Sequence, residues 1–225
     1  MNISVVIPTW NEAAALPETV SRIRKIPEIV EIIVADGGSG DHTAQIAQQL
    51  GCRVVNSPPG RGTQMRHGAR LASGDVVLLL HADTWLPTDA GKAILNCLEN
   101  KSVVAGGFWK VFQNPHWLMR GSRIKCAIRL YLFGRIMGDQ AMFVRRDILE
   151  KIGGVPDVPL MEEFELCRLL RQHGKLALAD ATVETSGRRF RERGVVRTYL
   201  RMGRVTLQYY LGSSLRSLKD IYEKP

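Results

Sequence analysis

The 225-residue sequence has no C-x-x-C pair, no long apolar run and few aromatic residues, which make up 7% of the chain. Its four cysteines are 45, 29 and 41 residues apart, a spacing that disfavours a zinc site and suits free thiols in a reducing compartment. The longest purely apolar run is five residues, whereas a membrane-spanning helix needs about 20. We expect no signal peptide, because the first residues run straight into a strand-like stretch. These absences favour a cytoplasmic protein.

Charge is present but uneven. The net charge is +9, yet residues 1–110 hold ten basic and ten acidic side chains. Residues 111–135 carry five basic groups and no acid, residues 136–187 have a net charge of −3, and residues 188–225 have a net charge of +7. Two basic blocks therefore flank an acidic segment. Such blocks usually face anions, which include phosphates, nucleic acid and anionic membranes.

Runs of aliphatic residues alternate with helical patterns through residues 1–80. This alternation predicts an α/β fold, with a mostly parallel, Rossmann-like sheet and helices on both faces. The pattern is less regular in residues 111–194, and residues 195–225 are typical of a basic amphipathic C-terminal helix. We predict strands at 3–7, 29–35, 53–55, 75–80, 104–112, 141–145 and 177–184, and helices at 11–26, 43–50, 64–72, 116–133, 147–152, 162–173 and 195–211.

Polar groups stand at the carboxyl ends of the predicted strands. In parallel sheets, ligands bind outside these ends. We therefore expect the polar groups to meet at one edge of the sheet. Thr9 and Glu12 follow the first strand, Asp36 ends the second, and His81 and Asp83 follow the fourth.

Two of these carboxylates have local alternatives. Asp36 suits a contact with the base or ribose of a nucleotide, and equally a turn or N-cap role. Asp83 can hold Mg²⁺ or Mn²⁺ against a diphosphate. A lone acid at a strand end is more often a cap, and the residue two positions earlier is His81 rather than a second carboxylate.

Three later segments also have two possible roles each. Residues 60–64 offer flexible backbone, a guanidinium and a helix start for a phosphate, or else form an exposed turn. Glu162 and Glu163 lie at a predicted helix start, where acids favour the helix dipole, and one of them is alternatively a general base. Arg188 and Arg189 belong to a basic run that is either solvated or clamps a phosphate.

Taken in order, these segments resemble family 2 glycosyltransferases with the GT-A fold. Residues 7–12 (IPTWNE) resemble that family's V-I-P-x-x-N-E, and residues 34–43 its V-D-D-G-S-x-D-x-T. His81-Ala82-Asp83 stands in the place of its D-x-D, and Glu162-Glu163 in the place of its E-D pair. More narrowly, residues 60–190 are similar to a bacterial subfamily of the arsenosugar-cluster type, with its G-R-G-x-Q-M, L-H-A-D-T, G-D-Q-x-x-F-V-R-R and S-x-R-R-[WF] motifs.

The resemblance implies that residues 1–110 bind a nucleotide sugar and that residues 111–194 form the acceptor-binding and catalytic half of the same domain. It implies that Asp83 binds Mg²⁺ or Mn²⁺ and that Glu163 is the catalytic base. The sugar and acceptor site would contain Gly138, Asp139, Gln140, Arg188 and Arg189. The donor pocket would be lined by Pro8, Thr9, Glu12, Asp36, Arg61, Gln64, His81, Ala82 and Asp83.

The chain departs from the family pattern in two places. The family usually has Asp at the base position, where this chain has Glu163. Catalysis tolerates errors of about 1 Å poorly, so either the backbone compensates for the longer side chain or Glu162 takes the role. The subfamily also usually has Asn after Gln-Met, where this chain has Arg66-His67, which adds positive charge beside the expected diphosphate.

The expected activity is that of an inverting glycosyltransferase that moves a sugar from a UDP- or GDP-type donor to an acceptor hydroxyl. A nucleotidyltransferase is an alternative, although residues 3–20 lack the Gly-rich segment with Lys that it needs. A nucleic-acid-binding protein is a second alternative, disfavoured by the few aromatics and the neutral front half. An inactive homologue is a third, because of the Glu at the base position.

The two basic blocks lie mostly outside the donor motifs. Trp117, Leu118 and Tyr131 in one block, and Leu200 and Leu207 in the other, recur at helical spacing among arginines. This pattern suits peripheral docking on an anionic membrane, and equally suits solvated helices packed on the sheet. We expect an acceptor that is lipid-linked or otherwise anionic, and no nucleic-acid partner. The oligomeric state and the identity of the sugar stay open.

Overall fold

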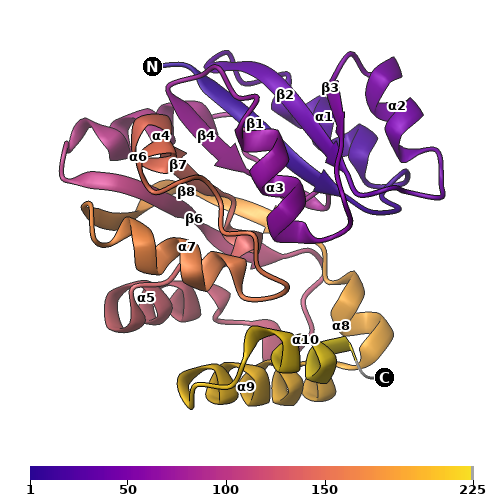
Figure 1. The fold of residues 1–225 in the computed structure, drawn as a ribbon, viewed down its shortest axis with the longest axis vertical. Helices are drawn as coiled ribbons and strands as arrows, with labels where there is room; N and C mark the ends of the chain where they lie inside the picture. Colours follow the sequence, from indigo (N-terminus) through magenta and orange to yellow (C-terminus); the bar gives the residue numbers. More distant parts are fainter. Residues whose placement is uncertain (224–225) are drawn as a thin grey trace.

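The computed structural model describes residues 1–223, in which one eight-stranded sheet carries helices on both faces (Figure 1). The order of the strands is β3-β2-β1-β4-β7-β6-β8-β5. Their bounds are β1 Ile3–Thr9, β2 Ile29–Asp36, β3 Arg53–Asn56, β4 Val76–Leu79, β5 Thr84–Trp85, β6 Val103–Phe112, β7 Met142–Arg145 and β8 Lys175–Thr185.

The first half of the sheet is parallel. β1 lies between β2 and β4, with Val5 opposite Ile32 of β2 and Leu78 of β4, and β3 extends the parallel set. Parallel neighbours need crossover connections, which α1 (Leu16–Ile23), α2 (Thr43–Gln49) and α3 (Arg61–Ala69) supply. The predicted alternation is confirmed, and the carboxyl ends of the four strands meet at one edge.

Strand side chains alternate between two apolar cores. In β1, Ile3, Val5 and Ile7 pack with α1, α2 and α4 (Ala90–Glu99), whereas Val6 packs with α3 on the other face. Helices α5 (Ser122–Phe133), α6 (Arg146–Lys151) and α7 (Glu162–Leu170) cover the rest of that second face. Burial on both faces explains the near-continuous aliphatic runs of these strands.

The second half of the sheet is mixed. β7 is antiparallel to β4 and β6, while β8 is parallel to β6 and antiparallel to the short β5. β5 has only two residues and therefore leaves no periodic pattern in the sequence. α1 begins at Leu16, later than predicted, because Pro17 favours the first turn of a helix. Three further helices were not predicted as separate elements: α4, α8 (Arg188–Arg193) and α10 (Leu215–Glu223).

The C-terminal segment, expected as one helix over residues 195–225, forms a helical hairpin. α9 (Val195–Tyr210) turns at Gly212 into α10, and residues 224–225 lie outside the described part. Figure 1 shows the pair, in yellow, at the end of the molecule opposite the N-terminus. Val205 of α9 and Leu218 of α10 pack with Phe164 at the start of α7. This packing holds the hairpin against the sheet edge where the strand ends meet.

The lengths of the helices and the state of the cysteines bear on the sequence analysis. α9, at 16 residues, is the longest helix there, and none of these helices is long and apolar enough to cross a membrane. The four cysteines form no disulfide among the described residues, and Cys52, Cys126 and Cys167 are buried.

Candidate functional site

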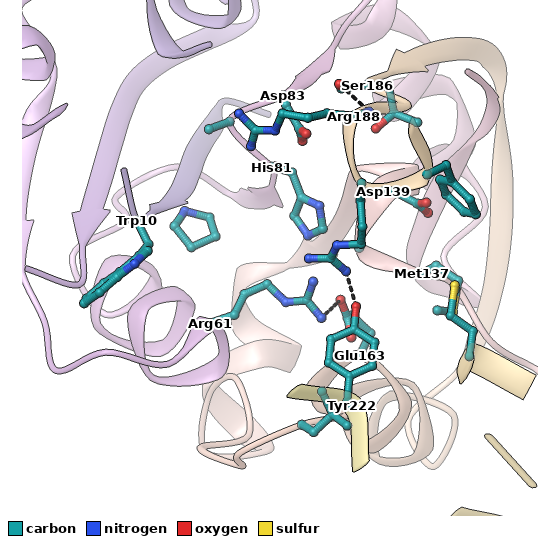
Figure 2. A pocket seen from close by; sticks show the side chains of 18 of the residues that line it. Trp10, Arg61, His81, Asp83, Met137, Asp139, Glu163, Ser186, Arg188 and Tyr222 are labelled. Atoms are coloured by element: carbon teal, nitrogen blue, oxygen red, sulfur yellow. Dashed lines mark hydrogen bonds and ion pairs between the residues drawn. The ribbon is translucent and has the colours of Figure 1, made fainter. Parts of the chain in front are cut away.

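A pocket of about 520 Å³ opens at the carboxyl edge of the sheet, between the strand ends, α7 and the C-terminal hairpin (Figure 2). Asp36, Gln140 and Glu162 do not line it, although each bonds to or adjoins a residue that does. The sequence-predicted residues that line the pocket are Pro8, Thr9, Glu12, Arg61, Gln64, His81, Ala82, Asp83, Gly138, Asp139, Glu163, Arg188 and Arg189.

Asp36 is engaged in the turn that follows β2. Its carboxylate accepts hydrogen bonds from Thr9 Oγ1 (2.9 Å), Ser39 Oγ (2.6 Å) and the N–H groups of Gly38 (3.0 Å) and Ser39 (2.8 Å). Burial disfavours the ionised form, but the bonds from Ser39, Thr9 and Gly38 outweigh it and lower the pKa of Asp36. Asp36 thus holds the side chain of Thr9, which lines the pocket, and the predicted contact of Asp36 with a nucleotide requires one of these donors to give way.

Two buried glutamines hold backbone segments around the pocket. Gln64 Nε2 donates to the carbonyl oxygens of Thr9 (2.6 Å) and Ala35 (3.0 Å), which ties α3 to the ends of β1 and β2. Gln140 Nε2 donates to the carbonyl of Phe108 (3.1 Å), which ties the 3₁₀ turn Gly138–Gln140 to β6. Both amides therefore position backbone that lines the pocket.

At the start of α7, two buried carboxylates share one guanidinium. Arg61 Nε donates to Glu162 Oε1, and Arg61 Nη2 lies 2.9 Å from Glu163 Oε1 (Figure 2). The preceding residue, Met161, has a φ of 65°, a conformation that costs free energy for any residue but glycine. Strain of this kind is usually retained where a site needs it.

The two acids differ in charge. Burial raises the pKa of Glu163 to about 7; the attraction of Arg61 opposes this rise, and repulsion from Glu162 and Asp139 adds to it. Burial also disfavours the ionised form of Glu162, but its bond to Arg61 outweighs burial and lowers its pKa. At neutral pH, Glu162 is therefore ionised and paired, whereas Glu163 exchanges its proton readily. The latter behaviour suits a general base.

His81 and Glu163 both reach the space beside Gly138. A Cβ on Gly138 would lie 2.4 Å from Glu163 Oε1 and 2.5 Å from His81 Nε2, so only glycine leaves room for both side chains. His81 Nε2 is buried and has no hydrogen-bond partner among the described residues. Burial lowers the pKa of His81 to about 4, and repulsion by Arg61 adds to the shift. The ring is therefore neutral at pH 7 and free to bind a ligand.

A second charge cluster joins the ends of β1 and β4 to α8. Arg188 Nη2 donates to both carboxylate oxygens of Glu12, at 2.9 and 3.1 Å. Burial raises the pKa of Asp83 despite the nearby Arg188, and burial raises the pKa of Glu12 despite the same guanidinium, with Asp83 adding to that rise. These raised pKa values mean that the nearby cations do not fully offset the free-energy cost of burying the two ionised carboxylates. An added cation would stabilise their ionised forms.

Asp139 forms an ion pair with Lys110 of β6. Burial disfavours the ionised form of Asp139, but Lys110 outweighs it and lowers the pKa. The pairing leaves Asp139 Oδ1 buried and without a hydrogen-bond partner within residues 1–223. Sequence reasoning missed Lys110, although a lysine inside an otherwise apolar strand, here 3% exposed, is the kind of signal that marks a buried ion pair.

The donor set of the pocket suits a divalent metal that a substrate helps to bind. Within the described part of the chain, no three His, Cys, Asp or Glu side chains form a ready-made metal site. The pocket presents the Asp83 carboxylate together with His81 Nε2 and Asp139 Oδ1, two buried atoms that have no hydrogen-bond partner in residues 1–223. Mg²⁺ and Mn²⁺ accept few protein ligands when phosphates and water complete their coordination. These residues therefore fit the expected metal.

The C-terminal hairpin closes one side of the pocket. Tyr222 of α10 lines the pocket, and its hydroxyl accepts a hydrogen bond from Arg189 Nη1 (Figure 2). Met202 and Val205 of α9 add an apolar wall. Sequence reasoning missed these three residues, because no local pattern indicates that α9 and α10 fold back onto the strand ends.

The sequence was compared with models of protein families and with curated proteins. The sequence model described as Glycosyl transferase family 2 matches residues 4–153. An undecaprenyl-phosphate 4-deoxy-4-formamido-L-arabinose transferase from Serratia proteamaculans is 29% identical over 163 residues, which cover 66% of this chain and 50% of the relative. A dolichol-phosphate mannosyltransferase from Pyrococcus furiosus is 28% identical over 165 residues, which cover 70% and 44%. The chain thus spans about half the length of the curated relatives it matches.

A comparison of structures supports the fold. A mannosyltransferase from Pyrobaculum calidifontis, solved with GDP-Man and Mn²⁺, superposes with a TM-score of 0.71 at 20% identity, covering 91% of this chain and 61% of that one. The expected GT-A fold, with its mostly parallel sheet between layers of helices, is confirmed.

Proposed function

The chain belongs to glycosyl transferase family 2, and we propose that it transfers a sugar from a nucleoside diphosphate to an acceptor hydroxyl with inversion at the anomeric carbon. The acceptor oxygen bonds to the anomeric carbon as the bond from that carbon to the diphosphate oxygen breaks. The acceptor proton passes to Glu163. The nucleoside diphosphate leaves with the bonding electron pair, and UDP or GDP is the expected carrier.

The observation that carries this proposal is the state of Glu163. Glu163 is 6% exposed, lines the pocket and has a pKa of about 7. A base is most effective when its pKa lies near the working pH. Ordinary surface glutamates are fully ionised and weakly basic at that pH. A poised carboxyl beside neutral His81, in the pocket that Asp83 also lines, supports proton abstraction within a site for phosphates.

The differences between the two acids in pKa, bonding and position support Glu163 over Glu162 as the base. Glu162 is bonded to Arg61, has a lowered pKa and does not line the pocket. Arg61 Nη2 also contacts Glu163 at 2.9 Å, which restrains the longer side chain that replaces the family's usual Asp. This contact, together with the space at Gly138, is the compensation that a Glu at this position needs.

The opposite part of the pocket suits the leaving diphosphate. A bound Mg²⁺ or Mn²⁺ would neutralise charge on its oxygens. Asp83 would hold the metal, with phosphate oxygens and water as the further ligands. Arg188 and Arg189 add guanidinium groups, which bind phosphate oxygens through paired N–H donors. Among the described residues, Arg189 bonds to the hydroxyl of Tyr222 and to no carboxylate, so its charge is available to an anion.

Family membership favours a glycosyltransferase over a nucleotidyltransferase or a nucleic-acid-binding protein. The acceptor is a separate question. A base with a pKa near 7 supports a hydroxyl acceptor, because an acceptor phosphate is already ionised and needs no base. The two relatives are named as transferases of undecaprenyl phosphate and dolichol phosphate. These names make a lipid phosphate the second candidate acceptor.

A panel of UDP- and GDP-sugars, each with and without Mn²⁺, tests the donor site by thermal shift. A donor at 100 times its Kd stabilises the protein by about 2.7 kcal/mol, which corresponds to an increase in Tm of about 5–10 °C for a chain of this size. We expect one donor to give such a shift, and Asp83→Asn to remove its Mn²⁺-dependent part. Asp89→Asn, an exposed acid outside the pocket, is the matched control. A flat panel would contradict the proposal, whereas a strong shift without any transfer would indicate an inactive homologue.

The rate should also depend on pH through Glu163. Because the base acts in its ionised form and its pKa is about 7, kcat/KM should rise across pH 6–8, from about a tenth to about nine tenths of its plateau. Donor binding, measured separately by titration at each pH, serves as the control. A kcat/KM that is constant between pH 5.5 and 8.5 would rule out a base with this pKa.

A further inference from the structure

The outer face of α9 is apolar and exposed. Val196, Leu200 and Leu207, with Leu211 directly after the helix, are between 58% and 74% exposed. They recur at intervals of 4, 7 and 4 residues, so they lie on one side of the helix. The opposite side of α9, through Met202 and Val205, lines the pocket. α9 thus separates the candidate active site from an uncovered apolar surface.

α5 presents a similar stripe. Ile124, Ile128, Tyr131 and Leu132 are between 45% and 75% exposed and follow the spacing of one helical face. In the 3₁₀ turn just before α5, Trp117 is also exposed. Isolated exposed apolar residues are ordinary, but stripes along whole helices usually mark an interaction site.

The two helices meet in space. Lys125 Nζ of α5 lies 3.2 Å from Tyr199 OH of α9 and 4.5 Å from the centroid of its ring. In Figure 1 both helices lie at the end of the molecule that is remote from the N-terminus. We call their exposed apolar side chains the apolar helical surface: Ile124, Ile128, Tyr131 and Leu132 of α5, and Val196, Leu200, Leu207 and Leu211 at α9.

The two helices that carry this surface, α5 and α9, contain only positive charges. Residues 100–138, which include α5, contain no Asp or Glu, and neither do residues 193–219, which include α9. Arg197 and Arg204 stand on the exposed face of α9 between its apolar residues, and Arg120 is exposed beside α5. These arginines form no ion pair with a carboxylate within the described residues. Their positive charge therefore remains available to an external anion.

We propose that the apolar helical surface docks on an anionic lipid bilayer, with its apolar side chains in the acyl boundary and its arginines among the headgroups. An amphipathic helix with arginine on its flanks and leucine on its face binds in the plane of such an interface. A second copy of the chain fits less well, because pairing this face with itself would bring uncompensated arginines together. Nucleic acid would not use the aliphatic side chains.

The proposal goes beyond the sugar-transfer reaction and does not depend on it. It also accounts for the position of the pocket, since α9 would lie between the bilayer surface and the residues that bind the donor. An acceptor carried in the bilayer would then be close to the site. Vesicle binding can be measured without donor or acceptor, so a failure of the proposed activity leaves this inference testable.

Co-sedimentation with vesicles tests the proposal. The full chain should pellet with vesicles of equal parts phosphatidylglycerol and phosphatidylcholine at low salt, and stay in solution with phosphatidylcholine alone. The double variant Leu200→Ser, Leu207→Ser and the double variant Arg197→Gln, Arg204→Gln should each reduce the partition coefficient about tenfold or more. All four side chains are exposed, so the fold should persist, which circular dichroism checks.

Matched controls separate docking from general effects. Val30→Ser replaces an exposed valine on β2, and Lys92→Gln with Lys101→Gln removes two exposed cations near α4, so neither should change vesicle binding. Wild-type protein that stays in solution with anionic vesicles at low salt would overturn the proposal. Equal binding by the Leu200→Ser, Leu207→Ser variant would also overturn it. A wild-type dimer that this variant converts to a monomer, without vesicle binding, would assign the surface to a second copy instead.

Discussion

Replacing Glu163 with glutamine should lower kcat for sugar transfer about 1,000-fold, because a positioned general base contributes about 10²–10⁴ to the rate. Glutamine keeps nearly the same shape but cannot accept the acceptor proton. Arg61 keeps its bond to Glu162, so the corner between α3 and α7 should stay folded. The Kd of the donor, measured by titration calorimetry, should change less than about threefold, because binding does not use the base.

The control for this variant is Glu165→Gln. Glu165 is the third acid in the first turn of α7, but it bonds to Tyr209 and Arg168 and does not line the pocket. It should therefore leave kcat within about twofold, as expected for a change outside the catalytic groups. Full activity in Glu163→Gln, together with loss of activity in Glu162→Gln, would transfer the role of base to Glu162. Full activity in both would remove the acid pair from the mechanism.

Replacing Gly138 with alanine should lower kcat about 100-fold, the cost of displacing a reacting group by roughly 1 Å. The new methyl group would lie 2.4 Å from Glu163 Oε1 and 2.5 Å from His81 Nε2, closer than atoms can approach. One or both side chains must shift, and each is buried enough to have few alternatives. The base and the neutral imidazole would then no longer face the same space.

Gly203→Ala is the matched control for the Gly138 variant. Gly203 lies in α9, and an added Cβ there would meet no atom within 4 Å. Activity should be unchanged, and Tm should stay the same or rise slightly, because alanine favours a helix over glycine. If Gly138→Ala retained wild-type kcat and Tm, the geometry around His81 and Glu163 would not limit the reaction.

Much of the fold is visible in local sequence because its cause is local. β1 and β4 are buried on both faces, so they appear as aliphatic runs, which only the buried Ser4 interrupts before β1 reaches Pro8. The helices between them place the strands in parallel, which brings Thr9, Asp36 and Asp83 to one edge. β5 and α10 escaped prediction for the opposite reason. Two residues leave no period, and α10 is defined by its packing on α9 and α7.

The partners of the site residues were not visible in the sequence. Arg61 and Glu162 are 101 residues apart, and Arg188 and Glu12 are 176 apart. The resemblance placed Arg61 in the donor pocket, near the base or the diphosphate. In the structure Arg61 lines the pocket and pairs with the two acids of α7. No local spacing predicts such pairs, because they depend on how α3, α7 and α8 pack around the sheet edge.

The sequence by itself determined which chemical groups reach the edge of the sheet: carboxylates after β2 and β4, an acid pair at the start of α7 and a basic run after β8. The tertiary structure decided what each group can do. A pKa depends on burial and on the distance to other charges, so the difference between Glu162 and Glu163 arises only once Arg61 lies against them. Exposure likewise depends on what covers a helix. Periodicity alone left α5 and α9 either packed or open, and the structure leaves their apolar faces uncovered.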